Sequence, residues 1–208
     1  MIDNNYINIH FLIIAISSYI IGSVPFAILI SKFLKLEDPR NFGSRNPGAT
    51  NMLRTGNKTA AIITLLGDMA KGLIALKITN IIYGGCYSEL VGISAVFVIL
   101  GHIYPIFANF KGGKGIATFF GIIIATNPLL SVYCAISWVL IAYIWRYSSL
   151  ASIVTVTLSV IYNIFAYELG NVDCAILVST IILSTILIYK HKENIKKLIN
   201  GTENRIII

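Results

Sequence analysis

Three polar segments interrupt a chain that is otherwise mostly apolar: residues 35–58, 109–115 and 190–208. They are rich in glycine, asparagine, serine and basic residues, and they contain few acidic residues. Basic side chains bind phosphate oxygens through charge-assisted hydrogen bonds, and glycine lets the backbone approach a ligand closely. The three segments therefore predict a pocket for phosphate or another anion.

The first segment contains the run Gly43 to Asn51, in which most residues are small or carry a short polar side chain. Gly43 and Gly48 permit a positive φ, and Arg54 can hold two phosphate oxygens at once. Ordering this much small-residue backbone costs conformational entropy, which a ligand or tight packing has to offset. The side chains expected to donate or accept hydrogen bonds there are Ser44, Asn46, Thr50 and Asn51.

The second segment reads Phe110-Lys-Gly-Gly-Lys-Gly115 and stands directly before an apolar stretch. Backbone N–H groups at the start of a helix favour an anion, and Lys114 adds a full charge. The spacing is not that of a P-loop, because Gly115 follows Lys114 where a P-loop requires Ser or Thr. The residues expected to form this anion site are Lys111, Gly112, Gly113, Lys114 and Gly115.

The last membrane helix is expected to run on past the membrane into the third segment. His191 and Asn194 then lie on the same side, at positions i and i+3, and both can enter a polar pocket. The lysines nearby fit an ordinary basic tail at the membrane surface.

A further group of charged residues falls inside the apolar stretches. Asp68 and Lys71 are three residues apart, and buried charges in lipid are costly and usually paired. A structural ion pair and a functional role are both open for them. His102 is expected to be a packed histidine with a hydrogen-bonded neighbour.

The elements that position these residues are membrane helices. The chain has 208 residues, of which 56% are hydrophobic and 12% charged, and its mean hydropathy is +0.80. Soluble domains contain about 25% charged residues, so lipid is the expected solvent. The formal charge of +7 lies between apolar stretches, which indicates anionic lipid or substrate and excludes nucleic acid. The expected spans are Tyr6–Ser31, 59–83, 88–108, 115–127, 128–145, 149–167 and 173–189.

The division at residues 127 and 128 decides the topology. A single helix over residues 115–145 would be about 46 Å long, too long for one crossing without strong tilt. Asn127-Pro128 favours a turn, which gives two short helices instead. With seven crossings, every Lys and Arg except Lys71 and Lys77 lies on one side. The positive-inside rule makes that side cytoplasmic.

We therefore expect an all-α, polytopic membrane protein with about seven transmembrane helices in a single domain, residues 1–208. The N-terminus is expected outside and the C-terminus in the cytoplasm, and Arg40 and Lys58 are expected to be solvated loop charges. No metal or cofactor is expected, because His10, His102 and His191 are far apart and no CxxC pair occurs.

Seven motifs together resemble the bacterial acyl-phosphate:glycerol-3-phosphate acyltransferase family, the integral-membrane enzymes of phospholipid synthesis. The resemblance covers nearly the whole chain, with Lys192 where the family often has Arg. The motifs are Gly22–Pro25, Asn41–Asn51, Gly67–Gly72, Gly101–Pro105, Phe110–Gly115, Ser149–Ser152 and His191–Asn194.

The resemblance implies acyl transfer from acyl phosphate to the 1-hydroxyl of glycerol 3-phosphate, which gives lysophosphatidate and phosphate. It also implies seven helices in the bacterial plasma membrane, an active site facing the cytoplasm, and membrane lipid as a partner. By motif position, the family's important polar residues fall on Ser44, Arg54, Lys114, His191 and Asn194.

Two questions stay open at this level. The general base is either His191 or a phosphate oxygen of a substrate, since both titrate near neutral pH. An anion or phosphate-ester transporter is the alternative function, and it would need polar groups through the outer half of the bundle. A non-catalytic scaffold would leave the glycine-rich segments unexplained.

Overall fold

The structure, a computed structural model, describes residues 4–83 and 88–206, and it places them in helices and connecting loops without any strand. The helices are α1 (Asn4–Gly22), α2 (Phe26–Phe33), α3 (Ala49–Leu53), α4 (Lys58–Tyr83), α5 (Ser88–Ile103), the 3-10 helix η1 (Ile106–Ala108), α6 (Ile116–Thr126), α7 (Pro128–Trp145), α8 (Ser148–Glu168), α9 (Cys174–Lys190) and α10 (Lys192–Ile199). The all-helical prediction is confirmed.

Several of these helices can cross a bilayer. By length and composition, five segments of the described chain suffice, and α9 with α10 makes a sixth. The five segments are Ile9–Phe33, Lys58–Tyr83, Ser88–Ala108, Pro128–Trp145 and Ser148–Glu168. α6 is apolar but has only 11 residues, so it rises about 16 Å, roughly half of a hydrocarbon core. The count of seven crossings therefore stays a prediction.

The break between α6 and α7 lies where the sequence predicts it. α6 ends at Thr126, and Asn127 caps α7 by accepting a hydrogen bond from the Leu130 N–H. Pro128 occupies the first helical position, where its missing N–H costs nothing. A second break was not predicted: the expected span Tyr6–Ser31 is interrupted after Gly22, and the chain restarts as α2 at Phe26.

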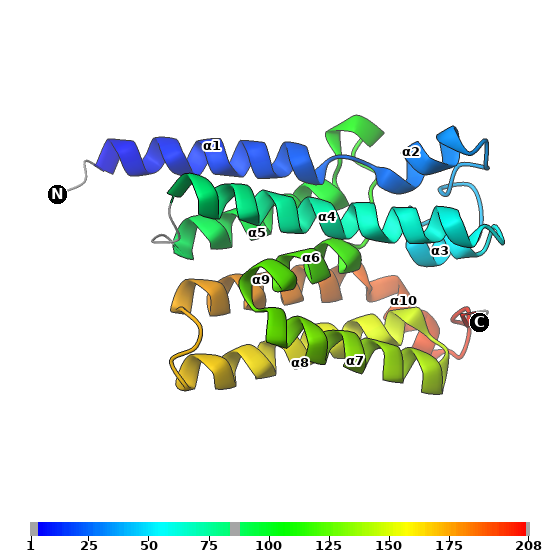
Figure 1. The fold of residues 1–208 in the computed structure, drawn as a ribbon. Helices are drawn as coiled ribbons and strands as arrows, with labels where there is room; N and C mark the ends of the chain where they lie inside the picture. The colour runs from blue at the N-terminus through cyan, green and yellow to red at the C-terminus, as the bar shows by residue number, and fades with distance from the viewer. Residues whose placement is uncertain (1–3, 84–87, 207–208) are drawn as a thin grey trace.

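The helices form two groups that face each other (Figure 1). α1, α4 and α5 make one group, α7, α8 and α9 make the other, and α6 lies between them. α1 packs on α5, α4 on α6, α6 on α7, and α9 on both α5 and α8. The start of α1 and the helix α10 lie at opposite ends of the bundle (Figure 1).

Glycines let the closest pairs of helices touch at the backbone. A Cβ on Gly101 of α5 would lie 2.2 Å from the Tyr19 carbonyl oxygen of α1, and a Cβ on Gly72 of α4 would lie 2.3 Å from the Thr118 oxygen of α6. Small residues at such contacts are typical of membrane helices, where packing drives association.

The outward faces of the helices are apolar. Leu12, Leu66, Val139 and Phe165 are all more than half exposed, as suits side chains in contact with lipid. Between the two groups, a buried core includes Leu76, Ile99, Phe119, Val156 and Leu187.

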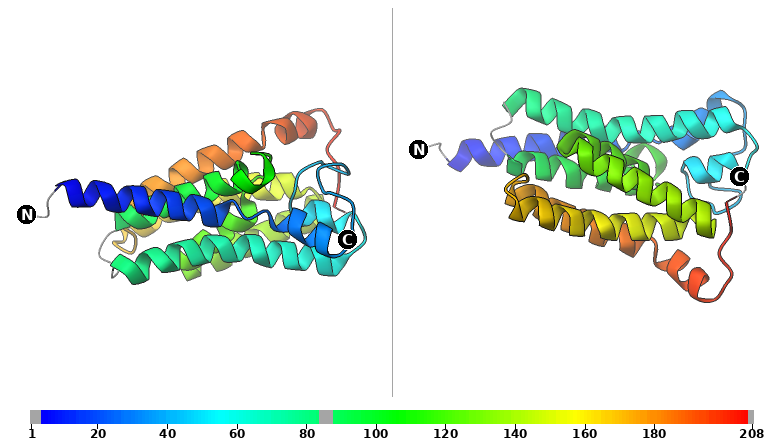
Figure 2. Two further views of the ribbon diagram at one scale, coloured as in Figure 1. Left: turned by 90° about the horizontal axis from the view of Figure 1, so that it is seen from above. Right: turned by 60° about the horizontal axis from the view of Figure 1, so that its bottom comes forward.

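The end of α9 differs from the sequence prediction. The expectation that this helix runs on as one element is wrong, because α9 and α10 are separate helices that meet at an angle of 56° with His191 between them. Figure 2 shows α10 turning away from the axis of α9 in both views. Asn194 is nevertheless buried on α10, as His191 is at the bend.

Candidate active site

A cavity of about 600 Å³ lies at the meeting point of the three polar segments. Its walls come from the 44–58 region, the start of α6, the α9–α10 bend and residues 203–206, and it continues between α4, α6 and α7. The five polar residues that the family resemblance marks as important all line the cavity: Ser44, Arg54, Lys114, His191 and Asn194.

Asn51 organises the first segment from within. Its Oδ1 accepts a hydrogen bond from the Ser44 N–H at 2.9 Å, and its Nδ2 donates to the carbonyls of Pro39 and Phe42. Gly43 closes over this side chain at φ +57°, where a Cβ would lie 2.3 Å from Asn51 Oδ1. The segment is therefore shaped by its own buried asparagine, which holds Ser44 toward the cavity.

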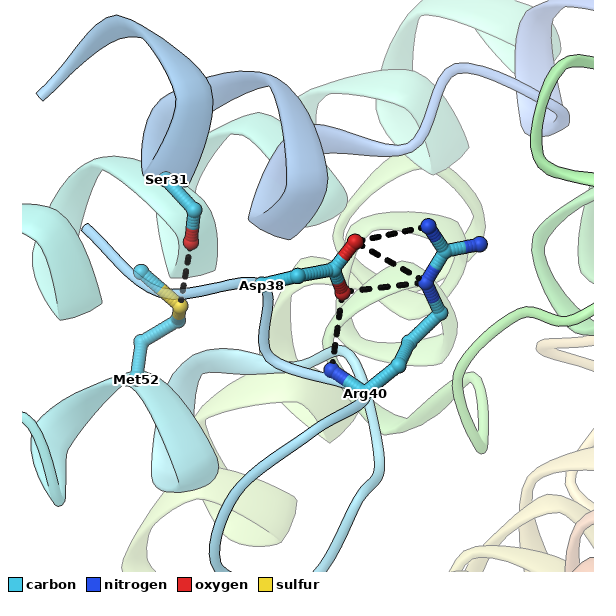
Figure 3. Close-up of polar contacts among 4 residues, drawn as sticks. All are labelled: Ser31, Asp38, Arg40 and Met52. Carbon is cyan, nitrogen blue, oxygen red and sulfur yellow. Dashed lines mark hydrogen bonds and ion pairs between the residues drawn. The ribbon is translucent and has the colours of Figure 1, made fainter. Parts of the chain in front are cut away.

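Two contacts anchor the same segment outside the cavity (Figure 3). Asp38 accepts hydrogen bonds from the Arg40 backbone and guanidinium, the shortest at 2.6 Å, and these bonds hold the pKa of its carboxyl below the usual value. The Ser31 hydroxyl of α2 donates to Met52 Sδ of α3 at 3.3 Å. Arg40 therefore stabilises a turn and does not line the cavity.

Of the remaining predicted residues of this segment, some line the cavity and one does not. Asn46, Gly48 and Thr50 line the cavity, and the Thr50 hydroxyl is hydrogen-bonded to Ser148 Oγ at 3.1 Å. Gly48 does not use the positive φ that glycine permits, since this residue is extended at φ −162°. Gly43 stands behind Asn51 and is not part of the wall.

In the second segment, the predicted free N–H groups of Gly112 and Gly113 are bonded to protein. Gly112 donates to the Ile103 carbonyl and Gly113 to the His102 carbonyl, both at 3.2 Å. These two glycines therefore pack against α5 and cannot offer those N–H groups to an anion. Lys111 is exposed and lies outside the cavity, whereas Lys114 and Gly115 line it.

A hydrogen-bonded chain crosses the polar end of the cavity. Lys114 Nζ donates to Asn194 Oδ1, and Asn194 Nδ2 donates to Glu203 Oε1 at 2.9 Å. The Ser149 hydroxyl donates to the same oxygen of Glu203 at 3.0 Å. Burial lowers the pKa of the Lys114 ammonium to about 8, and the charge of Glu203 opposes that shift.

His191 has a defined donor side. Its Nδ1 lies 2.8 Å from the Leu187 carbonyl oxygen, which can only accept, so Nδ1 carries a proton. In the neutral ring, Nε2 is then the free acceptor. The imidazole is 3% exposed and contributes to the cavity wall.

The rest of the cavity is an apolar groove, defined here by its lining side chains between α4, α6 and α7. They are Ile62, Leu65, Met69, Phe120, Trp138 and Val139. Trp138 is fixed by a hydrogen bond from its Nε1 to Ser152 Oγ at 3.1 Å. The outer faces of α4 and α7 beside the groove expose apolar residues, so the groove adjoins the lipid-facing surface.

Sequence reasoning missed several wall residues. Lys58, expected to be solvated, lines the cavity, and so do Asp68 and His102. Sequence reasoning did not identify Glu203, because this residue lies in the basic C-terminal segment and belongs to none of the seven motifs. Ser149 belongs to one of the seven motifs without a predicted role. Within the described residues, no three His, Cys, Asp or Glu side chains group as metal ligands would.

Comparison with known proteins adds independent information. The family model described as glycerol-3-phosphate acyltransferase matches residues 12–201. A protein named glycerol-3-phosphate acyltransferase from Bordetella petrii is 45% identical over 194 residues, covering 91% of this chain and 90% of its own. One of the same name from Paraburkholderia phymatum is 45% identical over 197 residues, covering 94% and 92%.

Two solved structures have the same fold. Both are crystal structures of PlsY (YgiH), described as an integral membrane glycerol 3-phosphate acyltransferase. The glycerol 3-phosphate form matches with a TM-score of 0.85 and 36% identity over 94% of each chain. The lysophosphatidic acid form matches with a TM-score of 0.83 and 35% identity, again over 94% of each chain.

Proposed function

This chain belongs to the glycerol-3-phosphate acyltransferase family, and we propose that it transfers an acyl group from acyl phosphate to the 1-hydroxyl of glycerol 3-phosphate. The products are lysophosphatidate and phosphate. One observation carries the proposal: a single cavity joins a cationic polar end to an apolar groove beside the lipid-facing surface. Both substrates carry phosphate and one also carries an acyl chain, so the cavity has a place for each part.

The polar end holds the phosphates. Arg54 and Lys114 supply positive charge, and Ser44 and the Thr50 hydroxyl supply hydrogen bonds at the wall. Charge-assisted bonds of this kind are about twice as strong as neutral ones. Asn51 acts indirectly, by holding the 39–44 backbone.

The apolar groove takes the acyl chain. Burying a methylene group is worth about 0.8 kcal/mol, so a long chain binds mainly through this groove. Trp138 stands in its wall with its indole fixed by Ser152.

The reaction is direct. The 1-hydroxyl oxygen attacks the acyl carbonyl carbon, the bond between that carbon and the phosphate oxygen breaks, and phosphate leaves with its electron pair. Acyl phosphate is already activated, so a covalent acyl-enzyme would add a step without removing a difficult one. Lys114 and Arg54 stabilise the charge that develops on the carbonyl and phosphate oxygens. Ser44 contributes a hydrogen bond.

The hydroxyl proton passes to a phosphate oxygen of a substrate, which has a second pKa near 6. His191 orients the substrate through its free Nε2, since its Nδ1 is committed to the Leu187 carbonyl. No metal or cofactor takes part.

The proposal includes a topology. The chain crosses the bacterial plasma membrane seven times, with the N-terminus outside and the cavity and C-terminus on the cytoplasmic side, because the basic segments gather there. Residues 1–208 act as a single acyltransferase domain, since the cavity wall runs from Ser44 to Ile206.

A transporter fits the structure less well. Buried polar side chains elsewhere in the bundle, such as Ser18 with Ser94 and Asn163 with Thr180, bond to each other between helices and do not line the cavity. Purified protein in liposomes with acyl phosphate and labelled glycerol 3-phosphate distinguishes the two. Lysophosphatidate formed without other protein supports the enzyme, and flux of label without product supports the transporter.

A further inference from the structure

Asp68 and Lys71 of α4 and His102 of α5 form a buried group beside the cavity, here called the α4–α5 cluster. Lys71 Nζ lies 2.9 Å from Asp68 Oδ1, and His102 Nδ1 lies 3.5 Å from the same oxygen. The three side chains are only 4–7% exposed. Buried charges are expensive in a membrane protein and are commonly kept for function. The proposed reaction gives this cluster no role.

The cluster is tied to the interruption between α1 and α2. Lys71 Nζ donates to the Val24 carbonyl at 2.9 Å, a carbonyl that lies in the interruption between the two helices. The lysine thus neutralises Asp68 and satisfies a partly buried backbone acceptor. Both bonds fix the carboxylate that His102 faces.

The ring of His102 lies at the contact between two segments of the active site. A Cβ on Gly113 would lie 2.2 Å from His102 Nε2 and 3.0 Å from the Pro47 carbonyl oxygen. Gly113 therefore fits between the imidazole and the first polar segment. Its N–H is bonded to the His102 carbonyl, so ring and backbone of one residue hold it.

Lys114 follows Gly113 directly, and Pro47 lies in the segment that carries Ser44 and Arg54. On the basis of the proposed function, we propose that His102 is a positioning residue. Oriented by Asp68 and Lys71, its ring sets the separation between the Lys114 ammonium and the Ser44–Arg54 segment. His102 thereby acts on the reaction through Lys114.

A double-mutant cycle tests this dependence, with kcat/KM for glycerol 3-phosphate measured in detergent micelles. His102→Gln removes the ring but keeps a polar side chain. It should lower kcat/KM about tenfold in the wild-type background and less than about threefold in the Lys114→Ala background, because residues that act together are not additive. The pH at which kcat/KM declines on the alkaline side, which depends on Lys114, should also move in His102→Gln.

Thr79→Val is the matched control, since Thr79 is buried on α4 and its hydroxyl donates to the Ala75 carbonyl of its own helix. It tests the loss of a buried polar group from α4, the helix that carries Asp68 and Lys71, and its pH profile should equal that of the wild type. If His102→Gln does not fold, Asp68→Asn combined with Lys71→Met frees the ring without leaving an unpaired charge. The same non-additivity with Lys114→Ala is expected of that variant.

Equal fold-losses in both backgrounds, with an unmoved pH profile, would overturn the positioning role and leave the proposed function intact. Wild-type activity in Lys114→Ala would overturn the positioning role, which acts through Lys114, whereas the absence of lysophosphatidate with the wild-type protein would overturn the proposed function. The two failures are therefore distinguishable in one set of proteins.

Discussion

Lys114 Nζ donates a hydrogen bond to Asn194 Oδ1, although 80 residues separate the two in sequence. Because the amide oxygen of Asn194 accepts from the lysine, its Nδ2 is left to donate, and it donates to Glu203. The donor and the acceptor of both hydrogen bonds, from Lys114 to Asn194 and from Asn194 to Glu203, are thereby defined. The position of the lysine depends on α10 and on the segment that follows it.

Lys114→Ala and Arg54→Ala should each lower activity by roughly 30- to 1000-fold, about 2–4 kcal/mol of transition-state stabilisation. Each removes a charge-assisted contact to phosphate. Lys196→Ala is the control, because this lysine is 72% exposed and its ion pair is with Glu193 on the same helix, α10. Steady-state measurements of the activity of the three purified variants test this prediction. Similar losses in all three would mean that general surface charge, not a site, is responsible.

The alkaline limb of the pH profile should report on Lys114. Burial lowers the pKa of this ammonium to about 8, so its charge is present below that pH and is lost as the pH rises through it. We expect kcat/KM to fall above pH 8, since kcat/KM reflects the free enzyme. Bound phosphate favours the charged form, so the limb in kcat should lie at higher pH. Lys114→Arg stays charged throughout, and a limb that persists in its residual activity would contradict the assignment.

Glu203→Ala should be more harmful than Glu203→Gln. The alanine leaves Asn194 Nδ2 and the Ser149 hydroxyl without their acceptor, at a cost of about 1–3 kcal/mol for each buried group. The glutamine keeps an acceptor oxygen but removes the negative charge that favours protonated Lys114. Its alkaline limb should therefore move to lower pH, as pH profiles of both variants would reveal. An unmoved limb would argue against electrostatic coupling between Glu203 and Lys114.

Transfer should proceed without metal and without an acyl-enzyme. Activity is expected to survive a strong chelator, and labelled acyl phosphate mixed with enzyme alone should leave no label on the denatured protein. The Ser44 N–H is bonded to Asn51, and the sequence places no His or Asp beside Ser44 to activate its hydroxyl. A stoichiometric adduct that disappears in Ser44→Ala would refute direct transfer.

The topology can be tested by cysteine labelling of intact cells in a background without native cysteines. Lys35→Cys and Asn200→Cys should resist an impermeant reagent, because both positions lie in the basic segments that we propose to face the cytoplasm. Asp173→Cys, exposed between α8 and α9, is the positive control and should be labelled. Ready labelling at positions 35 and 200 would exclude the seven-span arrangement.

Sequence alone predicted features that depend on local chemistry or on the membrane. The helix break at Asn127-Pro128 follows from capping and from the missing proline N–H. The meeting of Ser44, Arg54, Lys114, His191 and Asn194 at one cavity matches the expectation that the basic segments share one side.

Features set by tertiary partners were not predictable in the same way. Whether the N–H groups of Gly112 and Gly113 are free depends on the carbonyls of His102 and Ile103, which the fold brings to them. The bend at His191 and the role of Glu203 likewise depend on contacts between distant segments. No periodicity or spacing encodes such contacts.

The bonds of residues 203–206 also have a consequence for biosynthesis. Glu203 receives hydrogen bonds from Ser149 and Asn194, and the Ile206 N–H donates to the Arg146 carbonyl. Domains begin to fold from the N-terminal side while the ribosome is still translating. The helices can insert and pack early, but this wall stays open until residue 206 has left the ribosomal exit tunnel. A nascent chain therefore holds a membrane-embedded bundle before it holds a finished catalyst, which delays activity until residues 203–206 have left the ribosome.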